Sequence, residues 1–330
     1  MAFRLIEVVL PREKREETEE LLKKFGVMNY EYDESSEKNI KFNIVVKQDK
    51  SEKILENLEK KYSKLEDFRI IIIPVETLIP FPEEDKEIEQ ENDQEGRISR
   101  EEIYTHVSDM SKLTKIYMIL VAASALVASI GLLNDDVAVI IGAMIIAPLI
   151  GPSIGLSLAN VMGEKEFAIN AIKTNMVGIL IASIVSMIVG IVFAVNPQNP
   201  SIVLRTDVSR GSFFLALVSG IAGSFAVTSG LTSALVGVMI AVALLPPLAA
   251  FGLLVGSGNY SLALGSLLLF FVNFVCINLT ATISFIAQKI EPFEKEAIDA
   301  RKMARRSLVV WILLLVILYG IITLQRTLNI

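Results

Sequence analysis

The stretch Gly142-Ala-Met-Ile-Ile-Ala-Pro-Leu-Ile-Gly-Pro152 lies inside a long uncharged segment, yet it contains two glycines and two prolines. A second stretch, Gly237-Val-Met-Ile-Ala-Val-Ala-Leu-Leu-Pro-Pro247, also begins with Gly-x-Met-Ile and has a proline at its eleventh position. The separation is the same at both ends (237 − 142 = 95 and 247 − 152 = 95), and Gly163 and Gly258 keep it. We interpret the two stretches as parts of an internal repeat with a broken helix in each copy.

The composition of the chain is that of a membrane protein. Its 330 residues are 52% hydrophobic with a mean hydropathy of +0.54, which is too apolar for an ordinary soluble protein of this length. Residues 211–288 contain no Asp, Glu, Lys or Arg. Because about 20 helical residues cross the hydrocarbon core once, this run is long enough for three or more crossings. The sequence therefore predicts an α-helical multi-pass protein of the cell membrane, with the lipid bilayer as its partner.

Several function classes are disfavoured. The net charge of −6 comes from the soluble part of the chain and argues against a nucleic-acid partner. The single cysteine, Cys276, lies in an apolar run, so no disulfide framework or zinc-finger spacing exists. We expect no cofactor and no metal. The membrane segments lack a His-Glu-x-x-His motif, a nucleophile paired with a base, and a pair of catalytic acids, so we expect no enzyme.

Residues 1–80 are predicted to form a soluble domain. Runs of alternating or continuous apolar residues predict strands at 3–10, 28–32, 40–46 and 68–75. Apolar stripes at helical spacing predict helices at 13–25 and 49–65. The last strand is continuously apolar, so we expect it at the centre of the sheet. The order β-α-β-β-α-β is the ferredoxin-like split arrangement. By fold analogy such a domain senses a ligand or serves as an assembly or docking domain, and both alternatives stay open. The N-terminus lacks a signal-peptide pattern, so we expect this domain in the cytoplasm.

A linker and an amphipathic helix connect this domain to the membrane part. Residues 81–98 are dominated by acidic and polar side chains and are predicted to be a solvated linker. Residues 99–116 lead into the membrane, and a helix begins there at the capping box Ser99-Arg-Glu-Glu102. Its apolar residues follow at helical spacing, so we place it near the inner membrane surface. The only histidine, His106, is interpreted as solvated.

Seven apolar segments follow, at 117–133, 137–160, 168–195, 211–229, 233–256, 261–288 and 307–325. We assign 117–200 to the first membrane repeat, 201–288 to the second, and 289–330 to a basic loop and the last transmembrane helix. The distribution of Lys and Arg places the N-terminus inside and the C-terminus outside. Because each repeat has three crossings, the two copies are expected to lie upside down to each other. Inverted repeats with Pro/Gly-interrupted helices are typical of secondary transporters.

The prolines determine which backbone carbonyls are unpaired at the breaks. Each proline lacks an N–H, so the carbonyl four residues earlier loses its helical partner. The carbonyls concerned are those of Met144, Pro148, Val242 and Ala243. Two facing breaks would bind an ion or a small polar solute through carbonyls and half-helix ends. The alternative is that the prolines form packed kinks and that the glycines allow close helix contact.

Few other polar residues lie in the segments. Asn175 and Asn273 correspond to each other if the second copy is shifted by three further residues (273 − 175 = 98), and such side chains bridge helices or bind a solute. Asp135 and Asp136, in a turn predicted to face outside, are solvated or collect cations. The predicted solute path comprises Gly142, Met144, Pro148, Gly151, Pro152, Asn175, Gly237, Val242, Ala243, Pro246, Pro247 and Asn273.

Gly142-Ala-Met-Ile-Ile-Ala-Pro-Leu-Ile-Gly-Pro-Ser-Ile-Gly155, with its weaker copy and with Ile98-Ser-Arg-Glu-Glu102 before it, resembles a widespread prokaryotic family. That family is the uncharacterised hydrophobic membrane proteins, domain-of-unknown-function family 389, and the resemblance covers roughly residues 99–290. It implies a multi-pass membrane protein and no established activity, so it assigns no functional residues.

Two functional hypotheses follow from the sequence. The first is a membrane transporter or channel for a small ion or polar solute, regulated by the N-terminal domain. The second is a membrane sensor or scaffold without transport, whose ferredoxin-like domain binds a ligand or partner. A homo-oligomer is expected in either case, because edge strands of ferredoxin-like domains often pair.

Overall fold

The computed structural model describes residues 3–27, 30–33, 38–65, 67–75, 98–230, 233–290, 292 and 297–328, and only the backbone at 48–50, 233–242, 297–299, 325–326 and 328. The chain divides into two compact units, Met1–Glu102 and Ile103–Ile330. The acidic linker lies largely outside the described residues.

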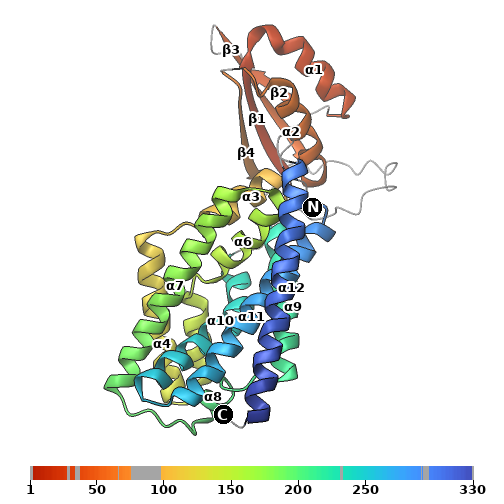
Figure 1. Cartoon of the computed structure of the whole chain (residues 1–330). Helices are drawn as coiled ribbons and strands as arrows, with labels where there is room; N and C mark the ends of the chain where they lie inside the picture. Colours follow the sequence, from red (N-terminus) through yellow and green to blue (C-terminus); the bar gives the residue numbers. More distant parts are fainter. Residues whose placement is uncertain are drawn as a thin grey trace, which may run out of the picture. The chain divides into compact units, whose positions relative to one another are not determined.

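The first unit contains the predicted β-α-β-β-α-β order (Figure 1). Its elements are β1 (Phe3–Pro11), a 3-10 turn (Arg12–Lys14), α1 (Arg15–Lys24), β2 (Tyr30–Asp33), β3 (Asn39–Lys47), α2 (Gln48–Tyr62) and β4 (Arg69–Val75). The antiparallel sheet has the strand order β2-β3-β1-β4. Alternate residues of β1 and β3, such as Ile6 and Phe42, are fully buried against Leu22 of α1 and Leu58 of α2.

The prediction for the last strand is wrong in one respect. β4 is an edge strand, because β1 lies between it and β3. Its side chains alternate between the two faces of the sheet, so Ile70 and Ile72 pack on the core while Ile71 and Ile73 are exposed. A continuously apolar strand therefore has one uncovered apolar face here.

The amphipathic helix is present as α3 (Arg100–Met110). The capping box forms as predicted: the backbone N–H and the hydroxyl of Ser99 donate to the Glu102 carboxylate at 3.1 and 2.9 Å. The Glu102 N–H donates back to the Ser99 hydroxyl at 3.3 Å. Ile103 and Val107, one turn apart, form the buried face of the helix.

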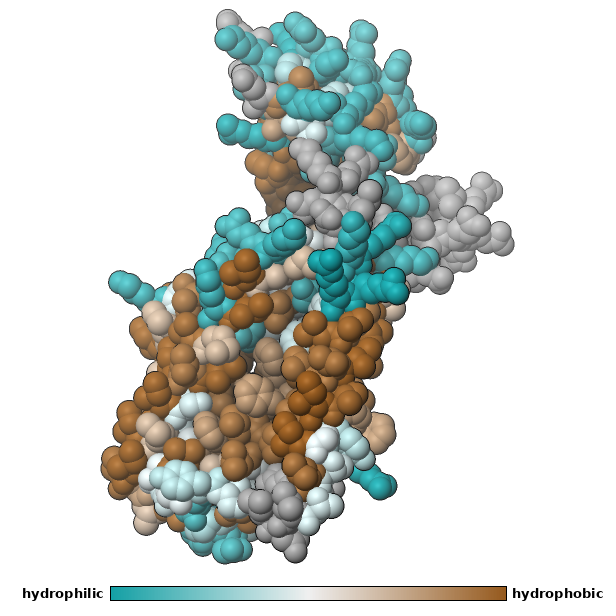
Figure 2. All heavy atoms as spheres, in the orientation of Figure 1, coloured by the Kyte–Doolittle hydropathy of each residue, from teal (hydrophilic) through white to brown (hydrophobic). Residues whose placement is uncertain are grey.

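The second unit is a helical bundle. Its elements are α4 (Lys115–Leu133), α5 (Val137–Ile146), α6 (Ile150–Met162), α7 (Lys165–Val192), α8 (Pro200–Val203), α9 (Arg210–Thr228), α10 (Ser233–Gly256), α11 (Tyr260–Ala287) and α12 (Ala297–Leu328). Figure 2 shows hydrophobic residues covering the visible side of this bundle. Five helices of the described residues are long and apolar enough to cross a membrane, or six if the bent pair α5–α6 is one span. The full number of seven stays a prediction, because the described side chains of α10 begin at Ala243.

The spacing of 95 residues recurs in the helix boundaries. Shifting α4 (Lys115–Leu133) by 95 gives the bounds of α9 (Arg210–Thr228), and shifting α7 (Lys165–Val192) by 95 gives those of α11 (Tyr260–Ala287). The first and third helices of the two copies therefore have the same lengths and the same separation along the chain.

The helix caps follow the same spacing. Thr114 caps α4 by accepting from the N–H of Tyr117, and Ser209 caps α9 by accepting from the N–H of Ser212, each at 3.0 Å. Gly163 and Gly258 end α6 and α10 in left-handed conformation, with φ of 82° and 79°. The N–H groups that follow them donate to carbonyls five residues back, at 3.0 Å (Glu164 to Ala159) and 2.8 Å (Asn259 to Leu254).

The two copies differ at the predicted break. In the first copy α5 ends at Ile146, Ala147 is extended (φ −69°, ψ 117°), and α6 begins at Ile150 after a bend of 50°. The cause is local: a residue before proline disfavours helical geometry, and Pro148 itself supplies no N–H. The broken helix predicted for this copy is confirmed.

In the second copy α10 is continuous from Ser233 to Gly256, with Pro246 and Pro247 inside it. The prediction of a second broken helix is therefore wrong. With a spacing of 95, Ala243 occupies the place of Pro148, so the residue that breaks the first copy has no counterpart. Pro246 and Pro247 correspond to Gly151 and Pro152, which lie in the first turn of α6, where a proline is tolerated.

Candidate functional site

The second half of the broken helix, α6, is buried on every side. All of its residues from Ile150 to Met162 are buried, although three of them, Ser153, Ser157 and Asn160, are polar. Their spacing of four and three residues places them along one face. A polar stripe on a fully buried helix needs hydrogen-bond partners, since an unpaired polar group costs several kcal/mol in an apolar environment (roughly 2–7).

One partner of the stripe comes from the other copy. The Ser157 hydroxyl lies 3.2 Å from both the backbone carbonyl oxygen and the side-chain oxygen of Asn278 on α11. The Asn278 amide nitrogen in turn donates to the carbonyl of Phe274 at 2.8 Å. This contact joins α6 and α11, and we call Ser153, Ser157, Asn175 and Asn278 the polar seam.

Asn175 of α7 completes the seam beside the break. The Ser153 hydroxyl is 3.1 Å from the Asn175 side-chain oxygen and 3.1 Å from the carbonyl of Leu149, which lies between α5 and α6. The Asn175 amide nitrogen donates to the carbonyl of Ala171 at 3.1 Å. The seam thus runs from the break to α11 through neutral hydroxyl and amide groups.

In the unbroken copy, an asparagine pairs with the freed carbonyl. The amide nitrogen of Asn273 donates to the carbonyl of Ala243 at 2.7 Å, and Pro247 is the residue that deprives this carbonyl of its helical partner. The Asn273 side-chain oxygen is buried and has no hydrogen-bond partner among the residues that the structure describes. This geometry makes Asn273 a helix-bridging residue that stabilises α10 at its prolines.

The other predicted path residues are distributed over the two copies. Gly142 and Met144 lie in α5, Pro148 at the break, and Gly151 and Pro152 in α6. Gly237 and Val242 lie in α10, where only the backbone is described, and Pro246 and Pro247 are buried there. Among the described residues, no hydrogen bond joins Asn175 to Asn273, so the structure does not bring the two shifted asparagines together.

The two aspartates of the turn after α4 make local contacts. Asp136 caps α5 by accepting from the N–H groups of Ala138 and Val139 at 3.0 and 3.1 Å. Asp135 has a φ of 55° and accepts from the N–H of Ser201 at 3.0 Å and from its hydroxyl. Nearby, burial lowers the pKa of Arg205, while the charge of Asp135 acts in the opposite direction. These contacts give both aspartates a structural role; a cation-collecting role stays a prediction.

Two glycines of α6 allow α3 to approach closely. A Cβ on Gly151 would overlap the carbonyl oxygen of Met110, and one on Gly155 would overlap the hydroxyl of Ser111. That hydroxyl is 2.8 Å from the carbonyl oxygen of Gly151 and 2.7 Å from that of Val107. The end of the amphipathic helix is therefore bonded directly to the helix that begins at the break.

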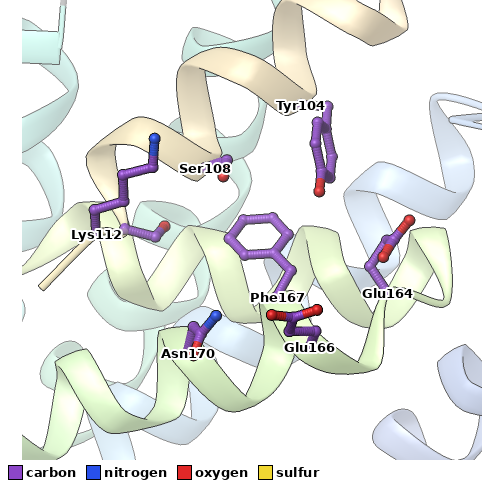
Figure 3. A pocket seen from close by; sticks show the side chains of 8 residues that line it. Tyr104, Ser108, Lys112, Glu164, Glu166, Phe167 and Asn170 are labelled. Atoms are coloured by element: carbon purple, nitrogen blue, oxygen red, sulfur yellow. The ribbon is translucent and has the colours of Figure 1, made fainter.

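A pocket of about 300 Å³ lies between the end of α3 and the start of α7. Figure 3 shows Phe167 at its centre, with Lys112 on one side and Glu164 on the other. Ser111, which bonds Gly151, also lines it. Within the described residues, no group of three His, Cys, Asp or Glu side chains is arranged to hold a metal ion.

Sequence reasoning missed Ser153, Ser157 and Asn278 as members of one site. The helical spacing of Ser153 and Ser157 in an otherwise apolar stretch was an available signal. The partner of Ser157 on α11, Asn278, was not, because the pairing of helices distant in the sequence is set by tertiary packing.

A family model, described as domain of unknown function (DUF389), matches residues 144–279. The chain belongs to the DUF389 family. The matched range begins inside α5 and ends inside α11, so it includes the break and the polar seam. The uncharacterized protein MJ0678 of Methanocaldococcus jannaschii is 39% identical over 276 residues, which cover 82% of this DUF389 chain and 84% of that protein. No solved structure matches this member of the family.

Proposed function

We propose that this protein is a transporter or channel of the cell membrane for a small ion or polar solute. The observation that carries the proposal is the polar seam, in which the buried helix beginning at the break meets α11 through Ser157 and Asn278. Buried polar residues in membrane helices commonly mark solute pathways, and interrupted helices supply unpaired carbonyls there. The side chains of the seam are neutral, which suits a small ion or an uncharged polar solute.

The arrangement of contacts supports an inverted repeat. α4 packs on α7 and α9 on α11, while α6 packs on α7 and α10 on α11. Between the copies, α7 packs on α10 and α11 packs on α6, so exchanging the copies leaves the pattern of contacts unchanged. Together with the three crossings predicted for each copy, this pattern is the one expected for two units of opposite orientation with a site between them.

In this proposal, the N-terminal domain regulates the membrane part through α3. α3 follows the acidic linker in the chain and bonds the first turn of α6 through Ser111 and Gly151. A displacement of α3 would disturb the helix that carries the seam.

We further propose that the N-terminus is cytoplasmic, that the protein is a homo-oligomer and that it is not an enzyme.

The test is a flux screen on the full chain in sealed liposomes, with monovalent cations, divalent cations, anions and small polar solutes. A solute whose flux saturates is then measured in Ser157→Ala and Asn278→Ala. The matched control is Ser186→Ala, because Ser186 is also buried and pairs with Ser129 at 3.0 Å within the first copy.

We expect a loss of flux of about tenfold or more in the two seam variants, the size of one lost interaction of about 1.4 kcal/mol, and little change in the control. Equal flux in all variants, or no flux of any solute, would count against the proposal.

The second candidate is the sensor or scaffold, which the exposed apolar face of β4 favours. Ligand binding to the N-terminal domain of the full chain, without flux, would support it.

A further inference from the structure

The pocket between α3 and α7 is separate from the polar seam and carries charges of both signs. Lys112 follows α3, while Glu164 and Glu166 stand at the start of α7. Figure 3 shows Lys112 and Glu164 on opposite sides of the Phe167 ring, with Glu166 and Asn170 together on a third side. A ligand that fills the pocket would meet the ammonium group of Lys112 on one side of the Phe167 ring and the carboxylates of Glu164 and Glu166 on two others.

The ammonium group of Lys112 has N–H donors left to bind an anion. Lys112 Nζ lies 2.6 Å from Asp109 Oδ1, and this aspartate does not line the pocket. An ammonium group has three N–H donors, so one carboxylate contact leaves donors for a phosphate. The Lys112 side chain is 64% exposed, so a ligand entering from outside can reach it.

The side of the pocket at Glu166 suits an organic cation. Tyr104 and Phe167 meet edge to face, with ring centroids 5.6 Å apart and planes at 78°. Aromatic faces attract ammonium groups, and Figure 3 shows the carboxylate of Glu166 beside the Phe167 ring. The Asn170 side chain adds a neutral acceptor.

The pocket lies at the border of the apolar surface, which indicates that such a ligand comes from the membrane. On α4, Ile116 and Ile119 are exposed only a few residues beyond Lys112; on α7, Ile169 and Ile172 are exposed just beyond Glu166. Exposed isoleucines on membrane-spanning helices face lipid tails, so the charged pocket stands at headgroup level.

We propose that this pocket binds a zwitterionic headgroup of the phosphoethanolamine type, with its phosphate at Lys112 and its ammonium at Glu166. Because Ser111 lines the pocket and bonds the Gly151 carbonyl, an occupant would hold α3 on α6. This inference concerns a site distinct from the polar seam and does not depend on transport.

The test measures binding of radiolabelled phosphatidylethanolamine to the delipidated full chain in detergent, with phosphatidylglycerol as the lipid that has the phosphate but no ammonium. The variants are Lys112→Gln and Glu166→Gln. Lys165→Gln is the matched control, because Lys165 is exposed beside Glu166 and does not line the pocket. Thermal unfolding of each variant checks that it is folded.

We expect saturable binding of phosphatidylethanolamine, affinity weakened about tenfold in each pocket variant, and little change in Lys165→Gln. Phosphatidylglycerol should bind more weakly to the unmodified chain and be insensitive to Glu166→Gln. Competition by free phosphoethanolamine would identify a soluble ligand of the same chemistry; lipid binding without such competition would identify the membrane lipid. Equal binding of both lipids, or equal binding by all variants, would overturn the proposal.

Discussion

The two copies of the membrane repeat share their caps and the lengths of their first and third helices, yet the middle helix is bent in one and continuous in the other. α5 and α6 meet at 50° around Pro148, whereas α10 passes through Pro246 and Pro247. The number of prolines is the same, so their position decides the outcome. A proline at 148 stands where the helix would continue on both sides, while in α10 the place equivalent to it is held by Ala243. Asn273 then supplies the donor that the Ala243 carbonyl lacks.

The test with the largest expected effect is to give the second copy the missing proline. Ala243→Pro should destabilise the chain by about 3 kcal/mol or more, because the ring removes a helical N–H and clashes with the preceding turn. Thermal unfolding in detergent measures the effect, and Ala243→Ser, which keeps the N–H, is the control. If Ala243→Pro and Ala243→Ser unfold at the same temperature, position is not what keeps α10 continuous.

The second test concerns Gly151, whose equivalent in α10 is Pro246. Gly151→Ala should cost about 1–3 kcal/mol, because the new Cβ would overlap the Met110 carbonyl and force α3 away. Gly142→Ala, in the same stretch, is the control, since a Cβ there meets nothing within 4 Å. The difference in unfolding temperature is the measurement. A similar shift for both variants would mean that the close approach of α3 contributes nothing.

A smaller effect should distinguish the two asparagines. Asn273→Ala leaves the Ala243 carbonyl unpaired and should cost about 1–2 kcal/mol. Asn175→Ala should cost less, because Ser153 still has the Leu149 carbonyl to donate to, at 3.1 Å. Thermal unfolding of the two variants side by side gives the ranking. The reverse ranking would show that Asn175, rather than Asn273, is the more important bridge.

The smallest effect lies in the first unit and depends on pH. Hydrogen bonds from Lys61 and then Lys14 hold the pKa of Glu17 below its ordinary value of 4.5. A carboxylate whose folded pKa is lowered stabilises the fold above its unfolded pKa, and this is lost as pH falls through the folded pKa. The unmodified chain should therefore unfold at a slightly higher temperature than Glu17→Gln at pH 7. This difference should shrink as the pH falls below the ordinary value of 4.5 and disappear once the pH is well below the lowered folded pKa, because the folded carboxylate is then protonated. A difference that persists in acid would contradict the ionic origin.

Much of this architecture is readable from the sequence because its causes are local. Helix spans follow from apolar runs, and the capping box at Ser99 follows from residue types at fixed spacing. The break follows from one proline. The position of β4 at the sheet edge does not, since strand order depends on which strands pair, and neither does the continuity of α10, which relies on a side chain 30 positions away. The seam was missed for the same reason: Ser157 and Asn278 are 121 residues apart.

The left-handed glycines at 163 and 258 have a consequence for the ancestry of the chain. Their cap geometry recurs at the same interval as the helix starts, although most side chains in between differ. A duplicated ancestral segment that diverged in composition while keeping its length accounts for this pattern. The number of residues between the first cap and the end of the third helix is the same in both copies, whereas their side chains mostly differ. The interval between turns is thus the property that the two copies share most closely.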